Sequence, residues 1–336
     1  MIREAIKKVS EKKNLDRGEM VSVFNEIMSG RLAKEDVKSF LRALSSKGES
    51  PEEIAAAAEI MREKAVKIET PIKDLVDTCG TGGAGINDVN VSTITAVVLA
   101  GAGVKVAKHG NRSFTGKCGS ADILEELGVN INITPDKVIE LIDKVNFGFI
   151  FAPNFHPAMK NVMEARKELA IRTIFNIIGP LSNPAGAAMQ ILGVYKPELT
   201  EVMAEALNKL GSKKAYIVHG LEGLDEISIK GRTKMTRLED GNIETCYVTP
   251  EDFGMKESPV EEIIGGSREY NAGIALNVLN GKEGAPRDMV LVNAGAALTM
   301  FGRAGDFRKG VKIAAGCIDS GKALEALKLL KKLSNQ

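Results

Sequence analysis

The composition of the chain excludes several classes of protein. Its 336 residues include 45 Lys and Arg against 44 Asp and Glu, so the formal net charge is +1. A protein that binds long nucleic acid mainly through its phosphates usually carries a basic excess, so we expect no nucleic-acid partner and only a local anion site. The share of hydrophobic residues, 44%, is typical of a globular protein with one large domain or two smaller ones.

Cysteine spacing and hydropathy indicate the compartment. None of the four cysteines forms a C-x-x-C pair, so neither a zinc site nor a disulfide framework is indicated. The N-terminal segment lacks the apolar core of a signal peptide, and the chain has no run of about 18 apolar residues. We therefore expect a cytoplasmic protein with no membrane partner.

Residues 1–72 are predicted to form a small helical domain. Capping boxes from Asp16 to Glu19 and from Ser50 to Glu53 mark two helix starts, and Gly30 is a stop signal. Apolar residues recur at helical spacing after each start.

Beyond residue 73, short apolar runs alternate with helical segments. The predicted strands are residues 75–79, 104–107, 147–151, 189–194 and 215–218. The predicted helices between them are residues 93–102, 121–127, 135–145 and 197–210. This alternation favours an α/β domain over residues 73–336, with a mostly parallel central sheet. Residues 233–237 and 243–248 are predicted to form a hairpin.

A glycine-rich segment follows the first predicted strand. Residues 77–85 read Asp-Thr-Cys-Gly-Thr-Gly-Gly-Ala-Gly, and a helix opens after Asn90. Glycines let successive N–H groups turn toward one anion, and a helix start adds unpaired N–H groups. The spacing is neither that of a dinucleotide-binding motif nor that of a P-loop. The alternative is a simple strand-to-helix turn that needs small residues.

A basic segment, residues 108–120, follows the second predicted strand. Lys108, His109, Asn111 and Arg112 are interleaved there with glycines and hydroxyl side chains. Open α/β sheets bind ligands at the carboxyl ends of their strands, so this segment suits a phosphate group. A solvated basic loop is the alternative. Two anion-suited loops together favour a substrate with more than one phosphate.

Adjacent carboxylates occur at Asp225 and Glu226, after the strand predicted at residues 215–218. Mg²⁺ prefers a few carboxylates together with substrate phosphates, which suits the two anion loops. A solvated turn is the alternative, and the pair alone is a weak signal.

Taken together, these segments resemble the anthranilate phosphoribosyltransferase family of tryptophan biosynthesis. The similarity covers nearly the whole chain, and the motifs occur in the family's order. The matching segments are residues 80–83, 90–93, 108–113, 172–184 and 223–226.

The resemblance implies a nucleoside-phosphorylase-like fold with a small helical domain and a larger α/β domain. The helical domain of the family is discontinuous, so residues from about 160 to 185 would rejoin residues 1–72. Phosphoribosyl pyrophosphate (PRPP) and Mg²⁺ would lie in the cleft between the domains, and the helical part would form a homodimer.

Site residues follow from the resemblance position by position. The residues expected to bind PRPP are Gly80, Gly83, Ala84, Asp88, Asn90, Val91, Ser92, Thr93, Lys108, His109, Gly110, Asn111, Arg112, Ser113, Phe114, Thr115, Gly116 and Ser120. The residues expected at the anthranilate site are Gly80, Asn111, Arg166, His109 and His156. The residues expected to bind Mg²⁺ are Ser92, Asp225 and Glu226.

The chain departs from the family pattern at three positions. Ala84 stands where the family usually has Asp, Asp88 where it has Ser or Thr, and Cys118 where Ser is common. The exchange at 84 and 88 could reposition a metal-linked contact. Alternatively, Asp88 simply caps the following turn.

The implied reaction joins the amino nitrogen of anthranilate to C1 of the ribose and expels pyrophosphate. Lys108, Arg112, Mg²⁺ and the loop N–H groups would neutralise the leaving group. Arg166 would pair with the anthranilate carboxylate. Because an aniline-type nitrogen is nucleophilic when neutral, no general acid or base is assigned, and His109 and His156 could equally be structural. The rival functions are a pyrimidine nucleoside phosphorylase of the same fold and a non-catalytic relative that binds nucleic acid.

Overall fold

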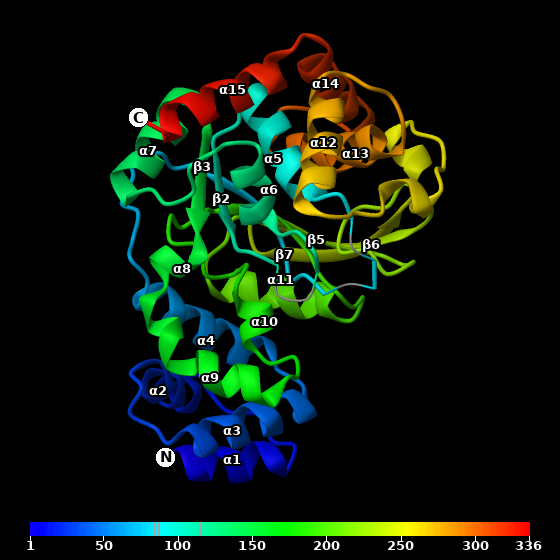
Figure 1. Ribbon diagram of the computed structural model, residues 1–336. Helices are drawn as coiled ribbons and strands as arrows, with labels where there is room; N and C mark the ends of the chain where they lie inside the picture. The colour runs from blue at the N-terminus through cyan, green and yellow to red at the C-terminus, as the bar shows by residue number, and fades with distance from the viewer. Residues whose placement is uncertain (84, 87, 114–115) are drawn as a thin grey trace.

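The computed structural model describes residues 1–83, 85–86, 88–113 and 116–336. The helical part occupies one end of the molecule and the α/β part the other (Figure 1). The four N-terminal helices are α1 (Ile2–Ser10), α2 (Arg17–Met28), α3 (Lys34–Lys47) and α4 (Pro51–Glu63). Both predicted capping boxes are present, at the starts of α2 and α4.

Two later helices pack against this bundle. Helix α9 (Lys160–Leu169) contacts α2 and α3, and α10 (Phe175–Ile178) contacts α4 (Figure 1). Phe24 of α2 lies against Phe175 of α10, with ring centroids 5.3 Å apart. The chain reaches these helices from the sheet through α8 (Ala152–Phe155) and the short 3₁₀ helix η1 (Pro157–Met159).

A seven-stranded mixed sheet forms the centre of the α/β part, in the order β3-β2-β1-β4-β5-β6-β7. The strands are β1 (Val76–Gly80), β2 (Val106–Gly110), β3 (Phe147–Phe151), β4 (Met189–Gly193), β5 (Lys214–Gly220), β6 (Thr233–Glu239) and β7 (Asn242–Val248). Neighbours from β3 to β5 pair in parallel, whereas β5–β6 and β6–β7 pair antiparallel. The predicted hairpin is β6–β7, and Asp240 and Gly241 form its turn with positive φ. The predicted mostly parallel α/β architecture is confirmed.

Strand β2 differs from the prediction. The strand predicted at residues 104–107 begins at Val106 and continues to Gly110, in register with Phe147–Phe151 of β3. Lys108 and His109, expected in a loop, therefore lie on a buried strand. Backbone pairing with β3 accounts for the extension, and a single sequence does not display it.

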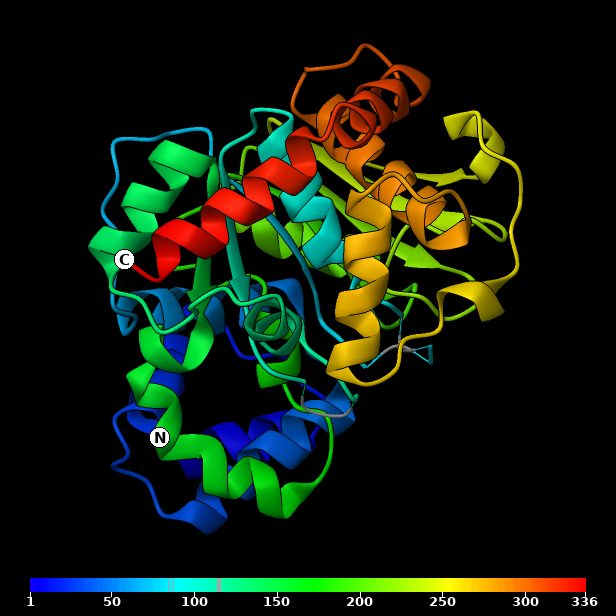
Figure 2. The same ribbon diagram turned by 45° about the horizontal axis from the view of Figure 1, so that its top comes forward.

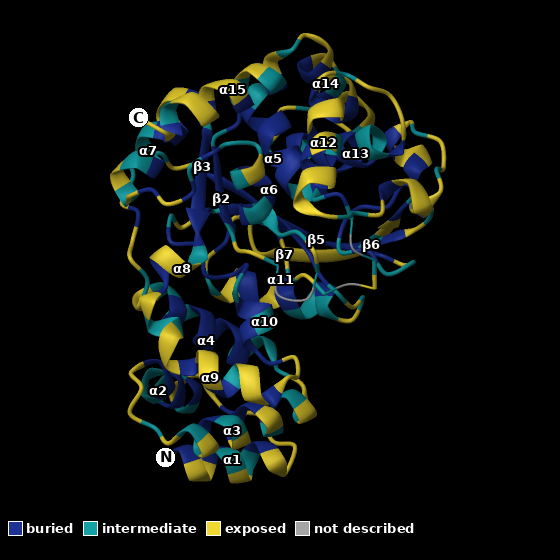
Figure 3. Ribbon diagram, in the orientation of Figure 1, coloured by how far each residue is buried: buried dark blue, intermediate teal, exposed yellow. Residues whose placement is uncertain are grey.

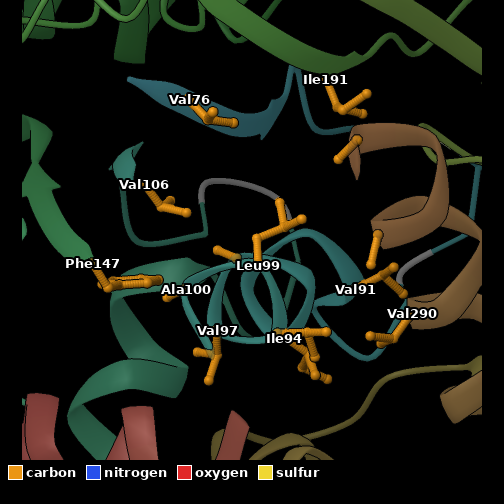
Figure 4. Packing of buried hydrophobic residues seen from close by; sticks show 14 of the residues in the cluster. Val76, Val91, Ile94, Val97, Leu99, Ala100, Val106, Phe147, Ile191 and Val290 are labelled. Carbon is orange, nitrogen blue, oxygen red and sulfur yellow. The ribbon is translucent and has the colours of Figure 1, made fainter. Parts of the chain in front are cut away.

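One face of the sheet is covered by a layer of helices that combines α5 with three helices from the C-terminal end of the chain. Helix α5 (Val91–Gly101) lies at the centre of this layer and contacts α13 (Ala285–Met300), α14 (Phe307–Asp319) and α15 (Lys322–Ser334). Figure 2 shows α15 crossing the sheet beside α5. Apolar side chains surround α5, among them Val76, Val106 and Phe147 from the strands and Val290 from α13 (Figure 4). The other helices of the α/β part are α6 (Ser120–Glu126), α7 (Pro135–Val145), α12 (Arg268–Leu279), η2 (Pro250–Phe253) and η3 (Val260–Ile263).

The opposite face of the sheet carries α11 (Leu199–Lys209) and shares a hydrophobic core with the helical bundle. Alternate residues of a strand point to opposite faces of the sheet. Ile191 therefore packs in the core around α5, and Leu192 packs in the core shared with the helical bundle. Buried residues run through both parts of the molecule, and exposed residues mark the outer sides of the helices (Figure 3). No helix among the described residues is both long and apolar enough to cross a membrane.

Candidate active site at the switch point of the sheet

The strand order reverses between β1 and β4, and ligands of open α/β sheets bind in the crevice at such a point. Gly80 ends β1, Gly193 ends β4, and both face Asp225. A Cβ added to Gly80 would lie 2.7 Å from Oδ2 of Asp225, and one added to Gly193 would meet the main chain of Asp225. Gly193 is therefore required for the close approach of the main chain at Asp225, and a larger residue at position 80 would displace the Asp225 carboxylate.

The glycine loop continues from β1 toward the start of α5. Gly82 and Gly83 have φ of +63° and +73°, a conformation that suits glycine. The Gly82 N–H donates a hydrogen bond to Asp225 Oδ2 at 3.1 Å. The loop and the acidic turn are thus fixed to each other, although 143 residues separate them. Ala84, expected among the PRPP contacts, lies outside the described residues.

Asp88 and Asn90 organise the start of α5. The Asp88 carboxylate accepts hydrogen bonds from the N–H groups of Asn90 and Val91, at 2.8 and 3.3 Å. This is the geometry of the capping alternative for Asp88. Asn90 has φ of +62°, and its side chain donates to the Cys118 carbonyl at 3.1 Å and accepts from Asn271 of α12 at 2.7 Å.

Lys108 lies beneath the glycine loop and is 1% exposed. Its Nζ donates to the Thr78 carbonyl and, at 3.3 Å, to the hydroxyl of Ser92 on the first turn of α5. Burial lowers the pKa of Lys108, while the carboxylates of Asp77 and Glu226 work against that shift. The lysine is therefore buried inside the site and is not part of a solvated basic loop. Thr93 is also buried, and its hydroxyl has no hydrogen-bond partner within the described residues.

The rest of the basic segment folds around Asp122 of α6. The N–H groups of Ser113 and Gly119 donate to Asp122 Oδ2 at 3.2 and 2.8 Å, and the Ser113 hydroxyl accepts from the Gly116 N–H at 2.7 Å. Arg112 forms ion pairs with Asp122 and Glu125, at 2.9 and 2.5 Å. Its guanidinium thus helps to fix the loop, and a contact of Arg112 with PRPP stays a prediction. Phe114 and Thr115 lie outside the described residues.

The main chain of the same segment is fixed at Gly110 and Asn111. The Asn111 carbonyl accepts hydrogen bonds from the Ser120 hydroxyl and the Ala121 N–H, both at 3.2 Å. A Cβ on Gly110 would meet the Ser120 hydroxyl and the ring of Phe149. Ser120 thus closes the segment back onto the end of β2.

Asp225 and Glu226, the acidic pair, lie next to the glycine loop, where Asp225 accepts the N–H of Gly82. Burial raises the pKa of Asp225, and burial together with the nearby carboxylates of Asp88 and Asp225 raises the pKa of Glu226 well above its usual range. Carboxylates that resist ionisation in this way are suited to a cation that compensates their charge. Among the described residues, no group of three or more His, Cys, Asp or Glu side chains forms a complete metal site. Asp225, Glu226 and the Ser92 hydroxyl nevertheless fit Mg²⁺, which binds through few carboxylates together with phosphates and water.

His109 and His156 meet side by side on the helical-bundle side of β2. Their Nε2 atoms are 3.2 Å apart, so one ring donates a hydrogen bond to the other. Burial lowers the pKa of His109 to about 3 and that of His156 to about 4. Both rings are therefore neutral at physiological pH. Arg166, on α9, is half-buried with its guanidinium 5.3 Å from the ring centroid of Phe175.

Two polar residues of the site had no role assigned from the sequence. Asp77 is fully buried on β1 and accepts hydrogen bonds from the His109 N–H at 3.2 Å and from the Asn183 amide at 2.8 Å. Asn183 also donates to the Ala107 carbonyl at 2.8 Å. A carboxylate within an apolar strand was the available signal for Asp77. Together the two residues fix β1 to β2 beneath the site.

Comparison with known proteins places this geometry in a family. Residues 3–65 match the helical bundle domain of a glycosyl transferase family, and residues 72–324 match its a/b domain. Anthranilate phosphoribosyltransferase of Persephonella marina is 50% identical over 338 residues and 99% of each chain. The crystal structure of anthranilate phosphoribosyltransferase from Thermus thermophilus matches with a TM-score of 0.92 and 41% identity, over 99% of each chain. The Saccharomyces cerevisiae enzyme in complex with PRPP and Mg matches with a TM-score of 0.91 and 30% identity, over 99% of this chain and 98% of that one.

The fold and the switch-point crevice are thus those of a phosphoribosyl-transferring glycosyl transferase. Within that class, the chain belongs to the anthranilate phosphoribosyltransferase family. The resemblance read from the motifs is confirmed.

Proposed function

We propose that this protein transfers the phosphoribosyl group of PRPP to the amino nitrogen of anthranilate, giving N-(5-phosphoribosyl)anthranilate and pyrophosphate in tryptophan biosynthesis. The observation that carries the proposal is the close approach of Gly80 and Gly82 to Asp225 at the switch point of the sheet, beside the buried side chain of Lys108. Relatives that share the whole length of the chain support it. They do not favour a pyrimidine nucleoside phosphorylase or a nucleic-acid-binding relative.

PRPP would bind across the glycine loop, the start of α5 and the segment that follows β2. Gly80 and Gly83 would contribute main-chain groups to the donor site, and Ser92 and Thr93 supply hydroxyl groups on the first turn of α5. Lys108 supplies a positive charge from below. The expected contacts with Asp88, Asn90, Val91 and the residues from His109 to Ser120 belong to the same proposal.

Mg²⁺, when bound, neutralises charge on the pyrophosphate. Asp225, Glu226 and Ser92 are the residues that would hold it, because they supply oxygen ligands and burial raises the pKa values of the two carboxylates. Gly82 keeps Asp225 in place through its N–H, so the orientation of this carboxylate does not depend on the metal.

Anthranilate would lie toward the helical part. Arg166 would pair with its carboxylate, and Asn111, Gly80 and the two histidines would complete the pocket. His109 and His156 are neutral and hydrogen-bonded to each other, so they present an uncharged surface to an aromatic amine. A neutral amine needs no strong base, and we assign no general acid or base.

Catalysis would then rest on positioning and on charge neutralisation. Lys108 and the loop N–H groups stabilise the negative charge that develops as the C1–O bond breaks. Arg166 orients the acceptor so that its nitrogen faces the ribosyl carbon.

The proposal extends to organisation and location. The helical domain would comprise residues 1–72 rejoined by about 160–185, and residues 73–336 would form the phosphoribosyl-binding domain. The packing of α9 and α10 on the N-terminal bundle supports this division. The helical domain would form a homodimer, and the protein would act in the cytoplasm.

A fluorescence assay tests the function directly. Anthranilate fluorescence should fall over time only when protein, PRPP and Mg²⁺ are all present, and pyrophosphate should appear in equal amount. A protein that consumes no anthranilate under these conditions but cleaves a pyrimidine nucleoside with phosphate would contradict the proposal.

A further inference from the structure

Arg172 connects the helical part of the molecule to the glycine loop. It lies between α9 and α10, and its carbonyl accepts a hydrogen bond from the Ser45 hydroxyl of α3 at 2.9 Å. Its guanidinium donates to the carbonyl of Gly83 in the glycine loop. One side chain thus bridges two segments that are 89 residues apart in the sequence.

The loop is shaped to receive this guanidinium. A Cβ on Gly83 would lie 2.7 Å from Nη2 of Arg172, so a larger residue at this position would displace the guanidinium. Gly83 also has φ of +73°, which other residues rarely adopt. The glycine at position 83 therefore leaves open the space that the Arg172 guanidinium occupies.

Tyr195 holds the guanidinium from its other side. The guanidinium carbon of Arg172 lies 4.1 Å from the Tyr195 ring centroid, the distance of a stacked pair. Tyr195 follows β4, and its N–H donates to the Thr81 hydroxyl at 3.1 Å, while the Thr81 N–H donates to the Gly193 carbonyl at 2.9 Å. The glycine loop is thus contacted at Gly83 by Arg172 and at Thr81 by Tyr195.

The guanidinium of Arg172 is exposed and carries more N–H donors than its contact with Gly83 uses. A cation so placed lies beside the region where a pyrophosphate would bind.

We propose that Arg172 is a positioning residue for the phosphoribosyl donor, which fixes the glycine loop at Gly83 in the shape that binds PRPP. The inference rests on the proposed function, because it takes the glycine loop as the donor site. Arg166, six residues earlier, would serve the acceptor. The two arginines of one segment therefore serve different substrates, and the helical part contributes to both sites.

A purely structural role for Arg172 makes a different prediction. A contact that only joins the two parts would lower thermal stability without separating the substrates. A positioning role predicts that the variant binds PRPP more weakly, because the side chain of Arg172 contacts the glycine loop at Gly83.

The test compares Arg172→Ala, Arg172→Lys and Arg232→Ala. Arg232 is a matched control, since its exposed guanidinium lies 4.3 Å from the Tyr247 ring centroid. PRPP affinity is measured by calorimetry with Mg²⁺ and no anthranilate, and both KM values by the fluorescence assay. Arg172→Ala should weaken PRPP binding and raise its KM about tenfold, the effect expected for one hydrogen bond from a charged donor. The anthranilate KM should change by less than about twofold.

If Arg172→Ala does not fold, the PRPP affinity of Arg172→Lys still tests the inference. Arg172→Lys retains a charge and a donor but not the planar face over Tyr195, so PRPP affinity should fall to an intermediate value. Arg232→Ala should leave both substrates unaffected. The inference would be overturned if every Arg172 variant that folds binds PRPP as tightly as the wild type does. It would also be overturned if the KM for anthranilate rises and the affinity for PRPP does not fall. Absence of turnover in the wild-type protein would refute the proposed function separately, because calorimetry still reports on PRPP.

Discussion

The side chain of Asp225 packs against Cα of Gly80, on the far side of the switch point between β1 and β4. The distance of 2.7 Å from its Oδ2 to a Cβ built on Gly80 means that a larger residue there would displace the carboxylate. The same oxygen accepts the N–H of Gly82. The glycine loop and the turn at Asp225 therefore form one unit, and the position of the carboxylate depends on the absence of a side chain at residue 80.

Gly80→Ala should displace Asp225 and impair turnover. The added methyl group would push the carboxylate away from the Gly82 N–H, and misplacement of a site group by about 1 Å can cost on the order of 10²-fold in rate. We expect a fall of that order and a higher Mg²⁺ requirement, measured by the fluorescence assay across a metal titration. Gly316→Ala in α14 is the control. Nothing lies within 4 Å of its Cβ, so it should keep full activity and gain about 0.5–1 kcal/mol of stability. Normal metal dependence in Gly80→Ala would show that the close approach has no functional role.

Glu226→Gln should separate metal binding from folding. Because the pKa of Glu226 is raised in the folded protein, its ionisation opposes folding as the pH rises above the unfolded value near 4.5. The glutamine variant should therefore be at least as stable as the wild type at pH 8 without Mg²⁺, as measured by thermal denaturation. Its turnover should fall on the order of 10²-fold, as should that of Asp225→Asn. Unchanged activity of both variants at saturating Mg²⁺ would reject the metal role of this pair.

The histidine pair should make the protein sensitive to acid. The pKa values of about 3 for His109 and about 4 for His156 lie below the ordinary 6.5, so the unfolded chain binds protons that the folded protein excludes. The stability that the neutral pair contributes is complete above about pH 6.5 and is lost as the pH falls toward 4 and then 3. His109→Gln combined with His156→Gln should lose less stability between pH 6.5 and 4 than the wild type does. Denaturant titrations at several pH values measure this, and equal losses would show that the pair does not control acid sensitivity.

Arg166→Ala should raise the KM for anthranilate by at least about tenfold, because it removes a charge-assisted pair with the substrate carboxylate. The KM for PRPP should change little. Steady-state kinetics with each substrate varied in turn provide the measurement. If PRPP affinity falls instead, Arg166 serves the donor and its assignment here is wrong.

Local sequence signals accounted for much of the fold. The capping boxes at Asp16 and Ser50 predicted the starts of α2 and α4, and the turn at Asp240 and Gly241 predicted the β6–β7 hairpin. Such features depend on residues close together in the chain, so a single sequence displays them. The alternation of strands and helices likewise predicted the parallel sheet.

Features that depend on distant residues were missed or misplaced. Lys108 was expected on a loop, but pairing of β2 with β3 keeps it on a buried strand. The ion pairs of Arg112 with Asp122 and Glu125 of α6 had no local signal, and a contact of Arg112 with the donor stays a prediction. The contact of Arg172 with Gly83 joins two ends of the site that no local pattern connects. These outcomes are set by tertiary packing, which local spacing does not record.

The most direct measurement is a crystal structure of this protein with PRPP and Mg²⁺. We predict the donor at the carboxyl ends of β1 and β4, with its pyrophosphate between the glycine loop and Asp225 and the metal on Asp225 and Glu226. A slot that stays empty at saturating donor, or a donor bound away from Gly80 and Lys108, would contradict it.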